Sequence, residues 1–171
     1  SFLAGAPLWG SLVALVEGET VLAGAARFPV TGEAIAAAPG AGVVVEGGRA
    51  GVSAVERVAD SLVLTTDERF PDAPECARPW RALADASRLA RTWGDCFGYY
   101  LVATGRAELM TDGRLSPWDA ACFLPIIEEA GGVITDWDGK RTAFGRGLIA
   151  TNRGVAAAAR GLLGVPTQRE T

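Results

Sequence analysis

The first third of the chain alternates apolar runs with short glycine and proline turns. Apolar runs over residues 8–16 and 20–28 are separated by Glu-Gly-Glu, a pattern that predicts a hairpin. Strand-like segments come next at residues 33–38 and 42–46, with Pro-Gly and Gly-Gly turns after them. A further apolar run at residues 61–65 predicts a buried strand. This part of the chain therefore predicts mainly β-structure.

The rest of the chain predicts helices that alternate with short strands. Residues 70–79 contain three prolines and are interpreted as a loop. Helices are expected at residues 80–89, 96–104, 116–130 and 153–163, and strands at residues 107–111, 133–137 and 147–151. Pro125 should kink the third helix or open one of its hydrogen bonds. We expect an α+β fold with helices packed on sheets.

Composition and charge narrow the choice of function. The length of 171 residues favours one domain, and a net charge of −4 argues against nucleic acid as a partner. No apolar run approaches the ~20 residues that a membrane span needs. The chain has no histidine, which excludes Ser-His-Asp catalysis and histidine-based zinc sites. Three widely spaced cysteines are typical of a reducing cytoplasm.

One helix start carries a candidate functional carboxylate. Ser116 suits the N-cap position and Pro117 the first helical position, which puts Asp119 at the third. An acidic residue there can complete a capping box and interact favourably with the helix dipole. The same carboxylate could instead hold a divalent cation such as Mg²⁺. Spacing alone leaves both interpretations open.

Three separated motifs resemble the inositol monophosphatase family. Trp118-Asp119-Ala120-Ala121 and the Ile-Ile-Glu-Glu-Ala-Gly-Gly stretch at residues 126–132 are similar to the C-terminal signature of the family. The substrate-facing loop of the family resembles residues 91–99, Arg-Thr-Trp-Gly-Asp-Cys-Phe-Gly-Tyr. Within the family, this sequence is most similar to the histidinol-phosphate phosphatase branch. Residues 1–10 are similar to the segment directly after the Asp-Pro-x-Asp-Gly-Thr motif of the family. The resemblance covers essentially the whole chain.

The resemblance implies a layered αβαβα sugar-phosphatase fold and a Mg²⁺-dependent phosphatase that acts on a small phosphorylated metabolite. Asp119 inherits the role of a metal ligand, and Asp112 faces the hydroxyl or amine of the substrate. Gly94, Asp95 and Cys96 are expected to line the substrate pocket, with Cys96 a packing residue and not a nucleophile. Because Asp95 and Asp112 are anionic, a cationic amino-alcohol phosphate suits them better than a neutral polyol. Histidinol phosphate, an intermediate of histidine biosynthesis, is the expected substrate, and inositol phosphate is the alternative.

The chain also departs from the family pattern. It contains neither the Gly-Glu-Glu segment nor the Asp-Pro-x-Asp-Gly-Thr motif that supply the other metal ligands of the family. We therefore expect residues 1–171 to be the C-terminal portion of a single, N-terminally incomplete phosphatase, inactive alone, with its catalytic groups upstream of Ser1. Exposed apolar surface is expected near the early strands. The other hypothesis is a non-catalytic chain that uses the same scaffold for binding or assembly, and the resemblance further implies a homodimer as one assembly state.

Several other side chains are expected to have structural roles only. The five tryptophans are interpreted as core or rim residues. Glu128 and Glu129 stand near a helix C-terminus, where an acidic residue interacts unfavourably with the dipole, so both are expected to be solvated.

Overall fold

The computed structural model describes residues 2–46 and 50–166. The first four strands form an antiparallel meander in the order β1-β2-β3-β4. They are β1 (Ser11–Glu17), β2 (Thr20–Phe28), β3 (Glu33–Ala38) and β4 (Gly42–Glu46). The strands alternate inward and outward residues: in β1, Leu12 and Ala14 pack against the core, while Val13 and Leu15 face away from it. The predicted hairpin and the two strands after it are confirmed.

The other strands form a mixed five-stranded sheet in the order β6-β5-β7-β9-β8. β5 pairs in parallel with both β6 and β7, and β9 pairs antiparallel with β7 and β8. The residues of β7 and β9 are all buried, as expected for central strands with covered faces. The bounds are β5 (Leu62–Thr65), β6 (Leu89–Arg91), β7 (Leu109–Asp112), β8 (Val133–Thr135) and β9 (Leu148–Thr151).

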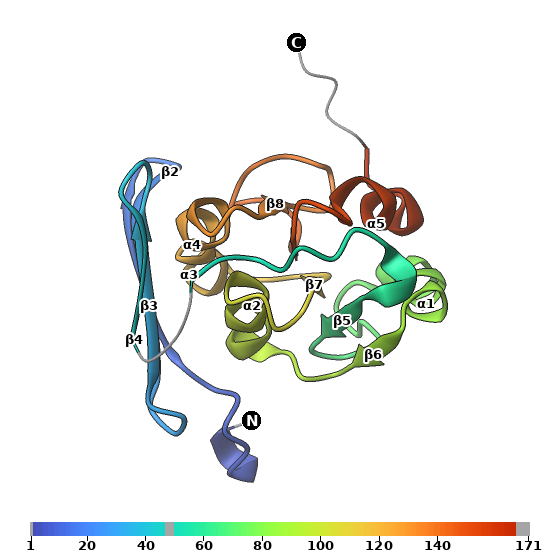
Figure 1. Cartoon of the computed structure of the whole chain (residues 1–171), viewed down its shortest axis with the longest axis horizontal. Coiled ribbons are helices and arrows are strands. Elements are labelled where there is room, and N and C mark those ends of the chain that lie inside the picture. The colour runs from blue at the N-terminus through green and yellow to red at the C-terminus, as the bar shows by residue number, and fades with distance from the viewer. Residues whose placement is uncertain (1, 47–49, 167–171) are drawn as a thin grey trace.

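Helices lie between the two sheets and beyond the second one (Figure 1). α2 (Asp95–Ala103), the short α3 (Pro117–Ala120) and α4 (Phe123–Glu129) form the middle layer, and α1 (Ala77–Ala86) and α5 (Ala156–Leu163) pack together on the far side. Short 3₁₀ turns occur at Phe2–Ala4, Val58–Asp60 and Pro74–Cys76. One apolar cluster joins the meander, the middle helices and the inner side of the second sheet, and a smaller one lies under α1 and α5. The described residues thus form four layers, β-α-β-α, of an α+β fold, as predicted.

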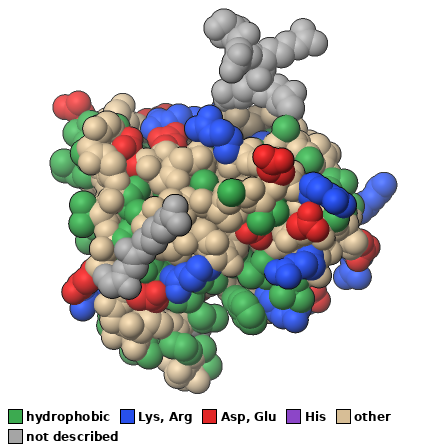
Figure 2. All heavy atoms as spheres, viewed as in Figure 1, with side chains coloured by type: hydrophobic (Ala, Val, Ile, Leu, Met, Phe, Trp, Pro, Cys, Tyr) green, Lys and Arg blue, Asp and Glu red, His purple; other side chains and the backbone are tan. Residues whose placement is uncertain are grey.

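The outer face of the meander carries exposed aliphatic side chains. Val13, Leu15 and Val44 are 67%, 60% and 71% exposed. Alanines from the neighbouring strands complete this apolar surface, which lies along the left edge of the molecule (Figure 2). The expectation of exposed apolar surface near the early strands is confirmed. We call this surface the outer face, and it consists of residues Val13, Leu15, Ala23, Ala25, Ala36, Ala38 and Val44.

Two helices differ from the prediction because of where proline falls. α1 starts at Ala77, inside the segment expected to be a loop, and Pro79 is its third residue. The helix expected over residues 116–130 is two helices, and Pro125 is the third residue of the second, α4. The first turn of a helix does not use its N–H groups for intrahelical bonds, so proline is accepted there. Pro125 therefore marks a new helix start and does not kink a continuous helix.

A glycine of the meander lies against the break between α3 and α4. A Cβ on Gly24 would approach the carbonyl oxygen of Cys122 to 2.1 Å, so β2 and the chain between these helices are in direct backbone contact. Only glycine allows this approach.

Two smaller expectations need correction. β6 lies within and just after the end of the predicted helix over residues 80–89, and the spacing of apolar residues did not reveal it. Glu129 is not merely solvated, because its two carboxylate oxygens accept hydrogen bonds from the N–H groups of Gly40 and Gly42, each at 2.8 Å. The tryptophans agree with the expectation of core or rim positions, because Trp80 and Trp137 are buried, whereas Trp93 and Trp118 are exposed at the surface. In the portion described, no helix combines the length and apolar character needed to cross a membrane.

Candidate functional site

A cavity of about 590 Å³ opens between the two sheets, and its walls come from both. Gly10 and Leu12 contribute from the start of the meander, and Thr66 and Asp112 from the ends of β5 and β7. Ligands of sheets with parallel strands bind beyond the carboxyl ends of the strands, which is where Thr66 and Asp112 lie. The full lining is Gly10, Leu12, Thr66, Asp67, Phe70, Pro71, Asp72, Ala73, Asp95, Cys96, Tyr99, Asp112, Gly113, Arg114, Leu115, Trp118 and Asp119.

The lining is strongly acidic. It contains five aspartates, and Arg114 is the single basic residue among the described lining residues. Hydrogen bonds from Arg69 lower the pKa of Asp67 to about 2, so this carboxylate stays charged and is paired with Arg69. The negative charge of Asp95 raises the pKa of both Asp112 and Asp119, although burial is the larger cause in each case. The cavity is therefore electrostatically suited to a cation or to the cationic end of a ligand.

Asp112 is held at the wall of the cavity by two hydrogen bonds. Its Oδ1 accepts from the backbone N–H of Thr66 at 3.2 Å, and its Oδ2 accepts from the hydroxyl of Tyr99 at 3.0 Å. Burial raises the pKa of Asp112, and these hydrogen bonds oppose the increase. Each carboxylate oxygen can accept a second hydrogen bond, so the group can still accept one from a ligand.

The backbone is strained at two residues that line the cavity. Asp95 has a φ of 57° and Phe70 a φ of 48°, and they are the only residues other than glycine with positive φ in the described chain. Both line the cavity. The side chain of Asp95 accepts a hydrogen bond from the N–H of Cys96 at 2.9 Å, which stabilises the left-handed conformation locally. Strained residues that cluster in a cavity favour a functional role for it.

Asp119 faces this cavity and does not cap its helix. α3 begins at Pro117 with Ser116 as N-cap, as predicted, but no side-chain capping hydrogen bond forms. The Asp119 carboxylate lies among the lining residues, near enough to Asp95 for the two charges to interact. Of the two interpretations left open by the sequence, the geometry favours a role in the cavity over the capping box.

The donor set fits part of a Mg²⁺ site. Carboxylate oxygens are the ligands that Mg²⁺ prefers, and a cation beside Asp119 would offset the repulsion from Asp95. Among the residues that the structure describes, no three His, Cys, Asp or Glu side chains come together as a potential metal site. Asp119 thus fits one ligand position of such a site.

The other predicted site residues lie in or next to the cavity wall. Cys96 lines it, is buried, and its thiol lies 3.7 Å from the carbonyl oxygen of Leu8. Burial raises the pKa of the Cys96 thiol to about 12, which fits packing and not nucleophilic attack. Gly94 is buried but is not itself a lining residue: a Cβ there would lie 2.4 Å from the Cα of Thr66. The role of Gly94 is to let the turn pack against Thr66.

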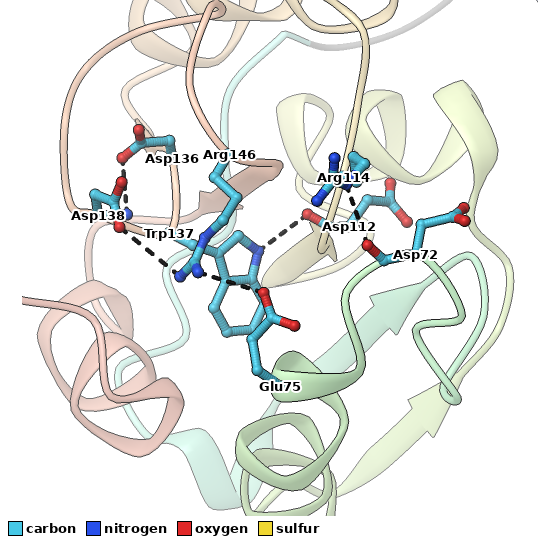
Figure 3. Close-up of polar contacts among 8 residues, drawn as sticks. All are labelled: Asp72, Glu75, Asp112, Arg114, Asp136, Trp137, Asp138 and Arg146. Atoms are coloured by element: carbon cyan, nitrogen blue, oxygen red, sulfur yellow. Dashed lines mark hydrogen bonds and ion pairs between the residues drawn. The ribbon is translucent and has the colours of Figure 1, made fainter.

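Polar contacts around the cavity fix the backbone that carries these groups (Figure 3). The indole N–H of the buried Trp137 donates to the backbone carbonyl of Asp112 at 3.0 Å. The Nε of Arg114 donates to the backbone carbonyl of Asp72 at 3.1 Å, which joins the loop after β7 to the loop after β5. Arg146 pairs with Glu75 at 3.3 Å and Asp138 at 3.7 Å beside the same loops.

Sequence reasoning identified Asp95, Cys96, Asp112 and Asp119 but missed Thr66, Tyr99 and Arg114. The position of Thr66 offered a usable signal, because it comes directly after the predicted buried strand at residues 61–65. Polar residues at the carboxyl end of a buried parallel strand are candidate ligand contacts. Tyr99 ends the motif at residues 91–99, but its place in an almost entirely apolar helix gave no sign that its hydroxyl contacts Asp112.

Comparison with known proteins identifies the family. The family model described as "Inositol monophosphatase family" matches residues 1–168. A histidinol-phosphatase from Chlorobaculum parvum is 41% identical over 154 residues, which cover 89% of this chain and 59% of that protein. A histidinol-phosphatase from Mycobacterium tuberculosis is 31% identical, with 89% and 60% covered. The chain thus spans about three-fifths of the length of these relatives.

The fold agrees with this assignment. A solved inositol monophosphatase from Zymomonas mobilis superposes with a TM-score of 0.89 at 23% identity, over 96% of this chain and 66% of that one. The match of the family model, the order of the motifs and the layered fold lead to one conclusion: this chain belongs to the inositol monophosphatase family, a family of phosphatases.

Proposed function

We propose that this chain is the substrate-binding and part of the metal-binding portion of a Mg²⁺-dependent phosphatase that hydrolyses histidinol phosphate. The observation that carries the proposal is the acidic cavity, in which Asp95, Asp112 and Asp119 line one wall region with a single arginine nearby. Histidinol phosphate carries an ammonium group next to its phosphorylated carbon. Such a cation is stabilised by fixed carboxylates, whereas a neutral polyol gains less from them.

The roles depend on how each side chain is held. Asp112, fixed by Thr66 and Tyr99, would accept a hydrogen bond from the amine of the substrate, and Asp95 would add a second negative charge beside it. Asp119 would be one ligand of Mg²⁺. When bound, such an ion stabilises the charge that develops on the phosphoryl oxygens. The residues of this chain bind and orient the substrate at that ion.

We also propose that residues 1–171 form the C-terminal portion of a larger single phosphatase. The difference in length from the relatives supports this, because about two-fifths of their sequence has no counterpart here. The exposed outer face supports it as well, since apolar side chains such as Leu15 are normally covered in a stable protein. Three free cysteines agree with a reducing compartment, and we propose the cytoplasm.

The test is a phosphate-release assay on the protein expressed from its complete open reading frame. Histidinol phosphate and inositol 1-phosphate are compared as substrates, with Mg²⁺ and with EDTA. We expect Mg²⁺-dependent hydrolysis with a higher kcat/KM for histidinol phosphate, and a loss of about 100-fold or more for Asp119→Asn if Asp119 holds the ion. Leu162→Thr, an exposed change on α5, serves as the matched control.

Three other outcomes would contradict parts of this proposal. A preference for inositol 1-phosphate would assign the cavity to a polyol phosphate and contradict the role of Asp95. An unchanged rate in Asp119→Asn would contradict its role as a metal ligand. No hydrolysis of either ester would favour the non-catalytic scaffold.

A further inference from the structure

Thr66 lies between the two carboxylates to which the proposed function assigns substrate contacts. Its backbone N–H donates to Oδ1 of Asp112 at 3.2 Å, and its Oγ1 accepts from the backbone N–H of Asp95 at 2.8 Å. Asp95 begins α2 and Asp112 ends β7, so one residue after β5 bridges two elements that are separate along the chain. Thr66 is also a lining residue of the cavity.

The turn at Gly94 is packed directly on Thr66. A Cβ on Gly94 would lie 2.4 Å from the Cα, 2.5 Å from the N and 2.5 Å from the Oγ1 of Thr66. The main chain at Gly94 is therefore packed against both the backbone and the hydroxyl group of Thr66. This contact leaves little room for the turn to move toward or away from β5.

The bond from Asp95 to Thr66 also supports a strained conformation. Asp95 has a φ of 57°, which is unfavourable for a residue with a side chain and persists where the surroundings hold it. The Thr66 hydroxyl satisfies the N–H of this residue, while the Asp95 carboxylate accepts from the next N–H, that of Cys96. Removal of the hydroxyl would leave the N–H of Asp95 without this acceptor.

Asp112, the other carboxylate that Thr66 contacts, is also held in place. The Asp112 carboxylate is fixed between Thr66 on one oxygen and Tyr99 on the other. Hydrogen bonds from Thr66 also favour the charged form of Asp112, because they oppose the increase in pKa that burial causes. Thr66 thus favours the charged form of the Asp112 carboxylate and holds the backbone of Asp95 in position.

We propose that Thr66 is a positioning residue that sets the spacing between Asp95 and Asp112 for the cationic end of an aminoalkyl phosphate. The inference rests on the proposed function, because it takes these two carboxylates as substrate contacts. Thr66 acts through them and takes no part in the reaction at phosphorus. Its effect should therefore depend on whether the substrate carries an ammonium group.

The first test compares two substrates in the full-length protein. Thr66→Val removes the hydroxyl and keeps the side-chain shape. We expect it to raise KM for histidinol phosphate roughly three- to tenfold, the range that corresponds to loss of one hydrogen bond. KM and kcat for p-nitrophenyl phosphate, which has no ammonium group, should stay within about twofold. Thr66→Ser should restore the wild-type KM for histidinol phosphate.

A neighbouring residue supplies the control. Thr65 has a buried hydroxyl with no hydrogen-bond partner among the described residues, and it does not line the cavity. Thr65→Val makes the same chemical change one residue away and should leave both substrates unaffected. Because Thr66 is exposed, Thr66→Ala should also fold, and it provides the same comparison if the valine variant does not.

The second test does not depend on catalysis. Thr66→Val should speed hydrogen exchange at the amide of Asp95, measured by NMR, while exchange in the centre of α2 stays unchanged. An unchanged Asp95 amide, or an equal effect of Thr66→Val on both substrates, would overturn the inference. A wild-type protein that does not hydrolyse histidinol phosphate would instead overturn the proposed function, and the Asp95 amide would still show whether Thr66 holds the turn.

Discussion

The two sheets of this chain differ in how many of their faces are covered. The five-stranded sheet is covered by helices on both faces, and the residues of β7 and β9 are buried along their whole length. The meander is covered on one face only, and Leu15 and Val44 of its outer face are mostly exposed. Both sheets have apolar sequences, so hydrophobicity alone does not tell them apart.

The difference between them lies in the partner that each face meets. The inner face of the meander has small residues such as Gly24 and Ala26, which let α4 and the segment before it approach closely. The outer face has larger aliphatic side chains at its edges, a composition suited to a further apolar partner. The site lies where the fully covered sheet meets the inner side of the half-covered one.

The strongest test of this difference is a pair of leucine truncations. Leu64 of β5 is fully buried, so Leu64→Ala should lower the free energy of unfolding by about 2–5 kcal/mol. Leu15 of β1 is 60% exposed, so Leu15→Ala should lower it by less than about 0.5 kcal/mol. Urea unfolding of residues 1–171 measures both. Equal losses would mean that the outer face is covered in solution.

The next effect concerns the contact between the meander and the helix layer. Gly24→Ala places a methyl group against the carbonyl of Cys122 and should destabilise the chain by about 1–3 kcal/mol. Gly161 in α5 has no atom within 4 Å of an added Cβ, so Gly161→Ala should stabilise by about 0.5–1 kcal/mol. Thermal unfolding of both variants gives the comparison. A neutral Gly24→Ala would show that the two layers can separate easily.

A smaller effect is expected from changing the outer face itself. Replacement of Val13, Leu15 and Val44 by threonine keeps β-propensity and removes apolar surface. Binding of the dye 8-anilinonaphthalene-1-sulfonate to residues 1–171 should fall, with the free energy of unfolding unchanged within about 0.5 kcal/mol per residue. Leu162→Thr, on α5, should leave the dye signal as it is. Undiminished fluorescence in the triple variant would place the dye elsewhere.

The last prediction concerns the thiols, whose effect on stability is absent at neutral pH. Burial raises the pKa of Cys76 to about 11 and those of Cys96 and Cys122 to about 12, above an ordinary value of 9.0. The folded state therefore retains these protons to higher pH than the unfolded state does. The contribution of the thiols to stability should be constant below pH 9 and should fall as the pH rises toward 11 or 12. At pH 8, iodoacetamide should modify the thiols in urea but only slowly in the folded chain, as measured by mass spectrometry. Fast reaction of Cys96 or Cys122 would reveal opening between the sheets.

Local sequence patterns were sufficient for the four strands of the meander, because glycine or proline marks the turns that join them; the Gly-Gly turn expected after β4 lies outside the described residues. They failed for β6, because a three-residue strand is defined by its partner β5 and not by its own periodicity. They failed also at the helix starts near Pro79 and Pro125. A proline in a helical pattern marks either a kink or a first turn, and tertiary packing decides between them.

The site was predictable only in part. Asp95, Asp112 and Asp119 stand in motifs that resemble a known family, and the fold brings them to one cavity. Thr66 belongs to none of those motifs, and its importance arises from contacts with residues 29 and 46 positions further along the chain. The sequence places Thr66 at the end of a predicted buried strand, but it does not reveal which distant residues Thr66 contacts.

Because Gly10 and Leu12 share the cavity with Thr66 and Asp112, a molecule that fills the cavity would contact both sheets. Occupancy would then connect directly two sheets that otherwise meet through the middle helices and one shared apolar cluster. Ligand binding favours whichever state contains the complete pocket. Saturation should therefore raise the melting temperature of the chain.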